Sequence, residues 1–336
     1  MVKAVRAAAM PAQWAIAVLA FARWAFALLA LLWPGVAAAQ TYPERPVRII
    51  VPMPAGGSYD VVGRLLANRL SDLLGQSFFV ENRTGAGTLV GTQSAAGAPA
   101  DGHTLLVGGL SNMVFNFALY QKVGYEPDDF VPIALVYSFP YVMMARHDLP
   151  QKDLAEIISY ARQSPGKLTI AHAGTGSGQQ IVGAAFMRLT GTTIVEVPYR
   201  TTQGAYPDML AGRIDLLFDS AAAALPFITA NKVRGVALLA PKRYRTVPDL
   251  PTISEAGLPG LGIESWIGLF APARTPPEVL DRLHQATRIA AEELKPQFEK
   301  SGGGLMQMPV AETDKFNKSE FDRWTRVIRD AGIRLD

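Results

Sequence analysis

The chain has 336 residues, 49% hydrophobic and 18% charged, with a formal net charge of +3 and no cysteine. A chain without cysteine has no disulfide, no thiol nucleophile and no thiolate metal site. Its length suits two ordinary domains or one large one.

The first 39 residues are predicted to be a signal peptide. Basic residues open the segment, the run Trp24–Trp33 is apolar, and Ala37–Ala39 provides the small side chains that a signal peptidase accepts. Arg23 interrupts the apolar stretch, which makes the segment a poor membrane span. We therefore expect cleavage near Ala39-Gln40 and a periplasmic mature protein. An uncleaved anchor is the alternative.

Removal of this segment lowers the formal net charge from +3 to zero. It contains Lys3, Arg6 and Arg23 and no acidic residue, so the remainder has 29 basic and 29 acidic side chains. Binding to nucleic acid requires a positive surface, and a neutral chain offers no bulk support for one. We expect no nucleic acid partner.

The mature chain opens with a strand, a glycine turn and a helix. Val47–Val51 is predicted to be a buried strand, and Ala55-Gly56-Gly57 leaves the backbone open to close approach. Ser58 is the expected N-cap of a helix that Gly75 ends. Such a connection can hold an anion on the helix N-terminus, or it can be an ordinary turn without a ligand.

Two more strand-to-helix units follow. The predicted strands are Phe78–Asn82 and Thr104–Val107, with a helix near Val90–Ala96 between them. Ser111 lies in the loop behind the last of these strands, where ligands bind in open α/β sheets. Three consecutive units of this kind predict a parallel, doubly wound sheet.

A second α/β set repeats the theme. Between the sets, residues 131–144 hold two apolar runs split at residues 137–140. The predicted elements of the second set are a helix at 154–163, strands at 168–171, 193–197, 214–218 and 233–239, and a helix at 180–189. Its glycine loop, Gly174–Gly178, stands directly before the helix at 180–189. The chain thus has two predicted lobes, each with a glycine-rich strand-to-helix loop.

The C-terminal part is predicted to form two long amphipathic helices, 276–300 and 311–330, that cover the sheets. Phe316, Phe321 and Trp324 are expected to be core contacts of the last helix.

The common catalytic templates are absent from the sequence. We find no phosphate-binding Gly-x-x-x-x-Gly-Lys, no His-Glu-x-x-His and no Gly-x-Ser-x-Gly, and the four histidines lack metal-ligand spacing. Asp60 and Asp219 could meet across a cleft as general acid and base. Both stand beside glycine turns, where carboxylates more often cap the backbone or accept from a ligand. We expect no enzyme, metal or cofactor, with an exported enzyme using Asp60 or Asp219 as an alternative.

Several motifs in order resemble the Bug family, the substrate-binding proteins of tripartite tricarboxylate transporters. They include Arg45-Pro46-Val47, Pro54–Asp60, Leu74-Gly75-Gln76, Val80–Arg83, Asp101-Gly102, Val197-Pro198-Tyr199, Leu250-Pro251-Thr252 and Glu255-Ala256-Gly257. The likeness runs from about Tyr42 to Ile333, nearly the whole mature chain.

The resemblance implies a type II periplasmic binding protein fold of two doubly wound lobes joined by two crossing strands, with the ligand cleft between them. Lobe 1 would comprise residues 40–140 and 267–336, and lobe 2 residues 141–266. The implied function is capture of a small carboxylated solute and its delivery to membrane permease subunits. A sensor kinase is the alternative partner, and the chain is expected to be a monomer.

The ligand-binding residues implied by the resemblance and the loops belong to both lobes. They are Ala55, Gly56, Gly57, Ser58, Asp60, Ser111, Thr175, Gly176, Ser177, Gly178, Gln179, Tyr199 and Asp219. We expect Asp60 to cap the backbone, with recognition of a ligand hydroxyl or amine as the alternative.

The sequence also departs from the family pattern. Met53 replaces a frequent aromatic residue, Tyr59 a small hydroxyl residue, Gln180 a histidine, and Arg200-Thr201 a lysine-glycine pair. Tyr59, Phe115, Phe139 and Tyr141 are candidates for an aromatic wall or for core positions.

Overall fold

The first strand-to-helix unit forms because its local signals agree with one another. β1 (Val47–Val51) is a buried β-branched strand, and α2 (Ser58–Leu74) follows it. α2 ends where Gly75 adopts a left-handed conformation with φ of 73°, which glycine tolerates best. In the computed structural model, residues 42–244, 247–330 and 332 are described. The expected signal peptide lies outside them.

The other predicted strands and helices occur close to their expected positions. The strands are β2 (Phe78–Asn82), β3 (Thr104–Gly109), β4 (Phe130–Arg146), β5 (Thr169–His172), β6 (Val195–Pro198), β7 (Leu216–Ser220), β8 (Val233–Leu238), β9 (Glu264–Pro272) and β10 (Gly304–Leu305). The helices are α3 (Leu89–Ala96), α4 (Asn116–Leu119), α5 (Leu154–Gln163), α6 (Gly178–Thr190), α7 (Thr202–Leu210), α8 (Ala221–Thr229), α9 (Pro277–Lys300) and α10 (Val310–Asp330). Short π and 3₁₀ turns are η1 (Ser111–Phe115), η2 (Pro127–Asp129) and η3 (Pro259–Leu261). The fold adds α4, α7, α8, β9 and β10, which the sequence did not predict. Among the described residues, no helix is both long and apolar enough to cross a membrane.

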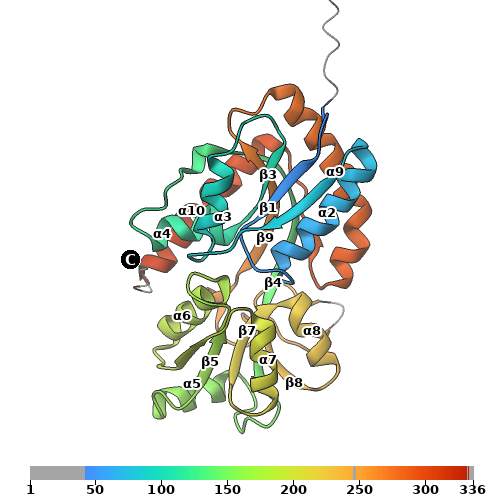
Figure 1. Ribbon diagram of the computed structural model, residues 1–336. Helices are drawn as coiled ribbons and strands as arrows, with labels where there is room; N and C mark the ends of the chain where they lie inside the picture. Colours follow the sequence, from blue (N-terminus) through green and yellow to red (C-terminus); the bar gives the residue numbers. More distant parts are fainter. Residues whose placement is uncertain (1–41, 245–246, 331, 333–336) are drawn as a thin grey trace, which may run out of the picture. The chain divides into compact units, whose positions relative to one another are not determined.

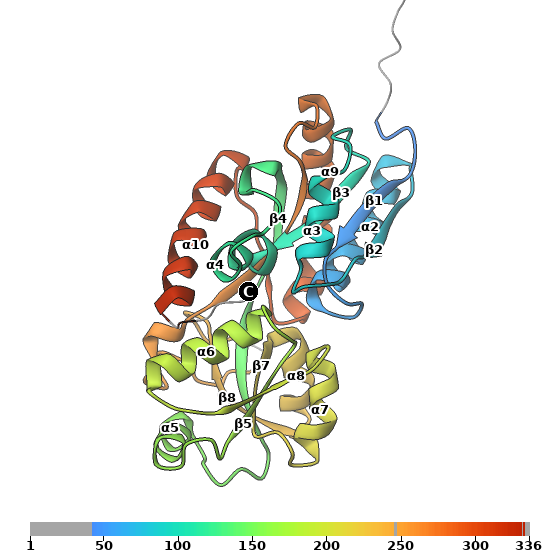
Figure 2. The same ribbon diagram turned by 60° about the vertical axis from the view of Figure 1, so that its left-hand side comes forward.

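The strands form one continuous sheet with a part in each lobe, and β4 belongs to both parts. The first part has the order β2-β1-β3-β9-β4, with β1 parallel to β2 and β3 and with β9 antiparallel to β3. In the second, β5 lies parallel to both β6 and β7, while β7 and β8 pair antiparallel with β4. Helices cover both faces: α2 and α9 lie on one side of the first part and α3, α4 and α10 on the other (Figure 1, Figure 2). The predicted pair of doubly wound lobes is confirmed.

One strand runs through both lobes. β4 pairs with β9 from Phe130 to Pro140, and then with β7 and β8 from Tyr141 onward. The two apolar runs in the sequence are therefore halves of one strand, because Ser138 and Pro140 still pair with β9 across register shifts. The chain returns beside β4 after β8, and Leu239 N–H donates to the Tyr141 carbonyl.

The buried residues of β4 show how it serves two cores. Val142 and Met144 pack with Leu217 and Leu238 in a cluster of the second lobe, whereas Met143 belongs to the larger core. Alternate side chains of a strand point to opposite faces, so β4 holds the lobes together through packing on both sides. In the C-terminal helix, Trp324 is buried as expected and packs edge-on against Phe115.

Candidate ligand-binding site

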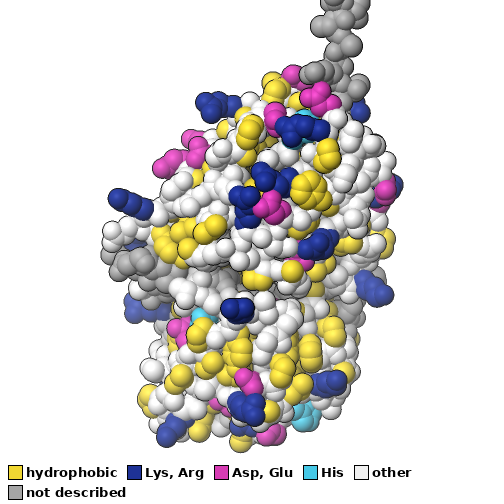
Figure 3. All heavy atoms as spheres, viewed as in Figure 1, with side chains coloured by type: hydrophobic (Ala, Val, Ile, Leu, Met, Phe, Trp, Pro, Cys, Tyr) yellow, Lys and Arg dark blue, Asp and Glu magenta, His cyan; other side chains and the backbone are white. Residues whose placement is uncertain are grey.

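A cavity of about 520 Å³ lies between the two lobes; we call it the main cavity. Its walls are the segments that follow β1, β2, β3, β5 and β6, together with the end of β7 and part of β4. These segments follow the carboxyl ends of strands, which is where open α/β sheets bind ligands. On the face shown in Figure 3, basic and acidic side chains are interspersed over both lobes.

The N-terminus of α2 borders the main cavity. Gly57 is the N-cap residue and Ser58 the first residue of the helix, so the expectation that Ser58 is the N-cap is wrong. The Asp60 side chain explains the difference: it reaches back to accept from Gly56 N–H at 2.9 Å. This contact satisfies a donor ahead of the helix, in the manner of the third residue of a capping box.

All the hydrogen bonds that the Asp60 carboxylate accepts from described residues come from the first lobe. Asp60 also accepts from Arg64 at 3.0 Å and from Asn82 at 2.9 Å, and it is only 3% exposed. Burial alone would raise the pKa of Asp60, but these three donors outweigh it and lower the pKa below its ordinary value. Asp60 does not line the main cavity, so the geometry fits the capping role.

The N-terminus of α6 borders the same cavity from the second lobe. Ser177 is the N-cap and accepts from Gln180 N–H at 3.3 Å, while the Gln180 side chain accepts from Gly176 N–H at 2.8 Å. The first N–H groups of a helix have no partner within it. Those of Gly178 and Gln179 thus remain beside the cavity, whose lining includes both residues.

Two buried tyrosines, Tyr59 and Tyr141, form part of the wall of the main cavity. Tyr59 accepts from Ser111 N–H at 3.3 Å, which leaves its own O–H free to donate. Tyr141, on β4, places its hydroxyl against Gly178, where an added Cβ would lie only 2.2 Å from it. Burial raises the pKa of both phenols, so both remain protonated donors. Phe139 also lines the cavity, whereas Phe115 is a core residue.

Asp219 lies on the opposite wall and is 2% exposed. It accepts from Ser220 N–H at 2.8 Å, from Tyr206 at 3.1 Å and from Gln179 at 3.4 Å. Burial raises the pKa of its carboxyl and outweighs the donors. The alternative in which Asp60 and Asp219 meet across the cleft as general acid and base has no geometric support, because only Asp219 lines the main cavity.

The fold brings most of the predicted residues to one place. The main cavity is lined by Gly57, Ser58, Ser111, Thr175, Ser177, Gly178, Gln179, Tyr199 and Asp219. Ala55, Gly56 and Gly176 lie in the same loops, and Asp60 lies in the first turn of α2, but none of these four residues lines the cavity. Sequence reasoning missed Thr202 and Gln203, which follow β6; the rule that ligands bind at the carboxyl ends of strands would have included them.

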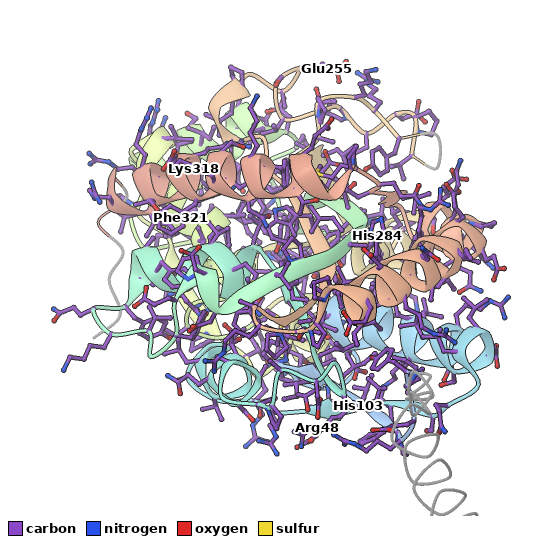
Figure 4. The ribbon with its side chains drawn as sticks, turned by 90° about the horizontal axis from the view of Figure 1, so that it is seen from above. Arg48, His103, Glu255, His284, Lys318 and Phe321 are labelled. Atoms are coloured by element: carbon purple, nitrogen blue, oxygen red, sulfur yellow. The ribbon has the colours of Figure 1, made fainter. Side chains whose placement is uncertain are left out.

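None of the four histidines lines the main cavity, although His172 contacts the carbonyl of Gly174, which does, at 3.0 Å. His103 and His284 occupy separate regions of the first lobe in Figure 4, and His284 contacts the Ile133 carbonyl at 2.7 Å. Among the residues that the structure describes, no group of three or more His, Asp or Glu residues could hold a metal ion.

Comparison with known proteins gives consistent results. The family described as "Tripartite tricarboxylate transporter family receptor" matches residues 62–333. Protein BugT of Bordetella pertussis is 32% identical over 308 residues, which cover 90% of this chain and 94% of BugT. A solved R. palustris protein with adipate is 32% identical with a TM-score of 0.82, covering 88% of this chain and 100% of its own. MatC from Rhodopseudomonas palustris with bound malate is 33% identical with a TM-score of 0.78, covering 85% and 100%.

Proposed function

We propose a function on one premise: the chain belongs to the tripartite tricarboxylate transporter receptor family, as its resemblance to Bug proteins predicted. We infer that it captures a small organic carboxylate in the main cavity and delivers it to the membrane subunits of such a transporter. Relatives determined with adipate and with malate support this ligand class.

The observation that carries the proposal is the meeting of two helix N-termini at one cavity. α2 presents Gly57 and Ser58, and α6 presents Ser177 and Gly178. Helix N-termini attract anions through free N–H groups and through the helix dipole. A cavity of about 520 Å³ also has the size usual for small-molecule sites.

Neutral donors would complete the recognition. The Tyr141 hydroxyl stands against Gly178 at the start of α6, and the Tyr59 hydroxyl lies at the end of β3, beside Gly109 and Ser111. Among the described residues that line the main cavity, Arg200 is the one with a positive charge, and it belongs to neither glycine loop. We infer that backbone N–H groups and phenols hold one carboxylate and that Arg200 is available to a second anionic group.

The alternatives have less support. An enzyme using Asp60 as acid or base would have to free it from Arg64, Asn82 and Gly56, and the family relatives are binding proteins. Delivery to a sensor kinase would use the same cavity, so genomic neighbours distinguish the two partners: paired membrane-protein genes support transport.

We further propose that residues 1–39 direct export, that 40–140 with 267–336 and 141–266 are the moving lobes, and that the mature protein works in the periplasm as a monomer. Intact mass of periplasmic protein should begin at Gln40. A mature form that retains Met1 would contradict the export proposal.

The ligand proposal is tested by calorimetry on residues 40–336 with malate, adipate and their methyl esters. Gly57→Val should abolish binding of both acids, because a branched side chain occupies the space beside the helix end. The backbone tolerates the change, since φ at Gly57 is −79° and an added Cβ meets only the Pro54 carbonyl oxygen at 3.6 Å. Equal affinity in a folded Gly57→Val protein would place the site elsewhere.

A further inference from the structure

A second cavity of about 220 Å³ adjoins the main one; we call it the side cavity. It lies among the first half of α2, the start of α8, the end of α9 and β4. Ser58, Gln203 and Ser220 line both cavities, and of the two residues directly before α2, Gly57 lines the main cavity and Gly56 the side cavity. A carboxylate held at that helix end would therefore stand at the junction of the two spaces.

A row of aromatic rings on β4 forms a floor shared by the cavities. Tyr137, Phe139 and Tyr141 alternate along the strand and so point to the same face. Phe139 and Tyr141 line the main cavity, and Tyr137 lines the side cavity. The Tyr137 ring stacks on Phe139 at 5.3 Å between centroids and lies 4.8 Å from Phe298.

The side cavity has an apolar wall and differs from the main cavity in charge, since Arg200 and Asp219 line the main cavity. One stripe of α2, including Val61 and Leu65, faces Ala223 of α8 and Phe298 of α9 across it. None of the described residues that line it is charged. Val61 is 48% exposed although it is a large hydrophobic residue, so its surface gains most from an apolar occupant.

We propose that the side cavity receives the apolar part of the ligand whose carboxylate binds at the α2 N-terminus. This inference rests on the proposed function and narrows its substrate class to carboxylates with an extended hydrocarbon or aromatic body. The volume equals that of about seven waters in the liquid, enough for several carbon atoms beyond the carboxylate. The polar rim of Ser58 and Ser220 lies at the junction, where the carboxylate would sit.

Calorimetry with butanoate, hexanoate, octanoate and decanoate tests the proposal. Affinity should rise about fourfold for each methylene that becomes buried and level off once the side cavity is full. Ala223→Leu fills the cavity and Val61→Gln makes its wall polar. Both changes should weaken the binding of octanoate at least tenfold, because several of its methylenes lose their buried contacts. The affinity for butanoate should stay within about twofold, because its chain is too short to fill the side cavity.

Ile289→Gln is the matched control, because Ile289 is a helical residue of similar exposure, 44%, that lines neither cavity. Ile289→Gln should leave the affinity for every carboxylate of the series unchanged. Octanoate affinity that is the same in wild type, Val61→Gln and Ala223→Leu would overturn the proposal. If malate or adipate binds but the series shows no length dependence, only the side cavity proposal fails. If no carboxylate binds, the proposed function fails as well.

Discussion

At the scale of single residues, the buried carboxyls of Asp60 and Asp219 have opposite electrostatic surroundings. Asp60 has three donors, one of them Arg64, and its pKa is lowered. Asp219 has neutral donors only and is more completely desolvated, and its pKa is raised. The sign of each shift predicts how the stability of the protein depends on pH.

Asp60→Asn should lower the free energy of unfolding by about 1 kcal/mol at pH 7, because the cap loses its charge. A lowered folded pKa means that this contribution is present above the ordinary value of 3.8 and is lost as pH falls through the folded pKa. Urea unfolding of wild type and variant should therefore converge in acid. Asp72→Asn, which removes an exposed pair with Arg69, should change stability little. A persistent gap at low pH would contradict the capping role.

Asp219→Asn should act in the other direction. The folded chain holds the Asp219 proton more tightly than the unfolded chain, so the carboxyl costs stability increasingly as pH rises above 3.8. The variant should be more stable than wild type at pH 7 by on the order of 1 kcal/mol, and the gain should shrink toward pH 4. Thermal unfolding without ligand measures this. Asp215→Asn, which breaks the pair with Arg146, should instead destabilise; a loss in both variants would refute the argument.

At the scale of elements, the contact between α6 and β4 fixes the second half of the site. Gly178 begins α6, and a Cβ there would lie 2.2 Å from the Tyr141 hydroxyl and 3.1 Å from its Cζ. Gly178→Ala should therefore displace the helix end or the ring, at a cost of about 1–3 kcal/mol, and weaken malate binding. Removal of the hydroxyl in Gly178→Ala/Tyr141→Phe should restore part of the stability. Gly57→Ala, with only ordinary contacts, should fold normally; equal losses in both alanine variants would contradict this account.

Local patterns in the sequence predicted most strands and helices, but not which of them pair and pack together. The glycine turns before α2 and α6 were found because capping and turn chemistry is local. The single strand β4 was read as two runs, because Pro140 suggests a break and its partner β9 is more than 100 residues away. The aromatic row on that strand, and with it the floor of both cavities, depends on this long-range pairing.

Within the site, too, contacts between residues far apart in the sequence decide which side chains reach the main cavity. The sequence identified Asp60 and Asp219 as equals beside glycine turns. Only the fold shows that Arg64 and Asn82 hold the first away from the cavity, whereas the second lines it. Likewise, the departure at Tyr59 was visible in the sequence, but its contact with Ser111 N–H joins residues 52 positions apart.

At the scale of the whole molecule, the two lobes are connected by β4 and by the returning chain beside it. β4 passes from one part of the sheet to the other. The lobes also lie close together at the cavity. If Gly87 of the first lobe carried a Cβ, that atom would lie 3.4 Å from the carbonyl oxygen of Thr175 in the second lobe. A ligand that touches both lobes favours the arrangement in which both contacts exist.

Ligand binding should therefore shorten the distance between the lobes. The natural chain has no cysteine, so Phe79→Cys on β2 and Val195→Cys on β6, both at exposed positions, can carry one spin label each. The distance between the labels should shorten with saturating adipate, and the free energy of unfolding should rise by about 2.7 kcal/mol at 100 times the Kd. A pair within the first lobe, Phe79→Cys and Ile289→Cys, should not respond, and Gly57→Val should abolish both effects. Stabilisation by adipate without any change in the interlobe distance would mean that the lobes are already closed before the ligand binds, and the ligand would then need a separate opening step to enter.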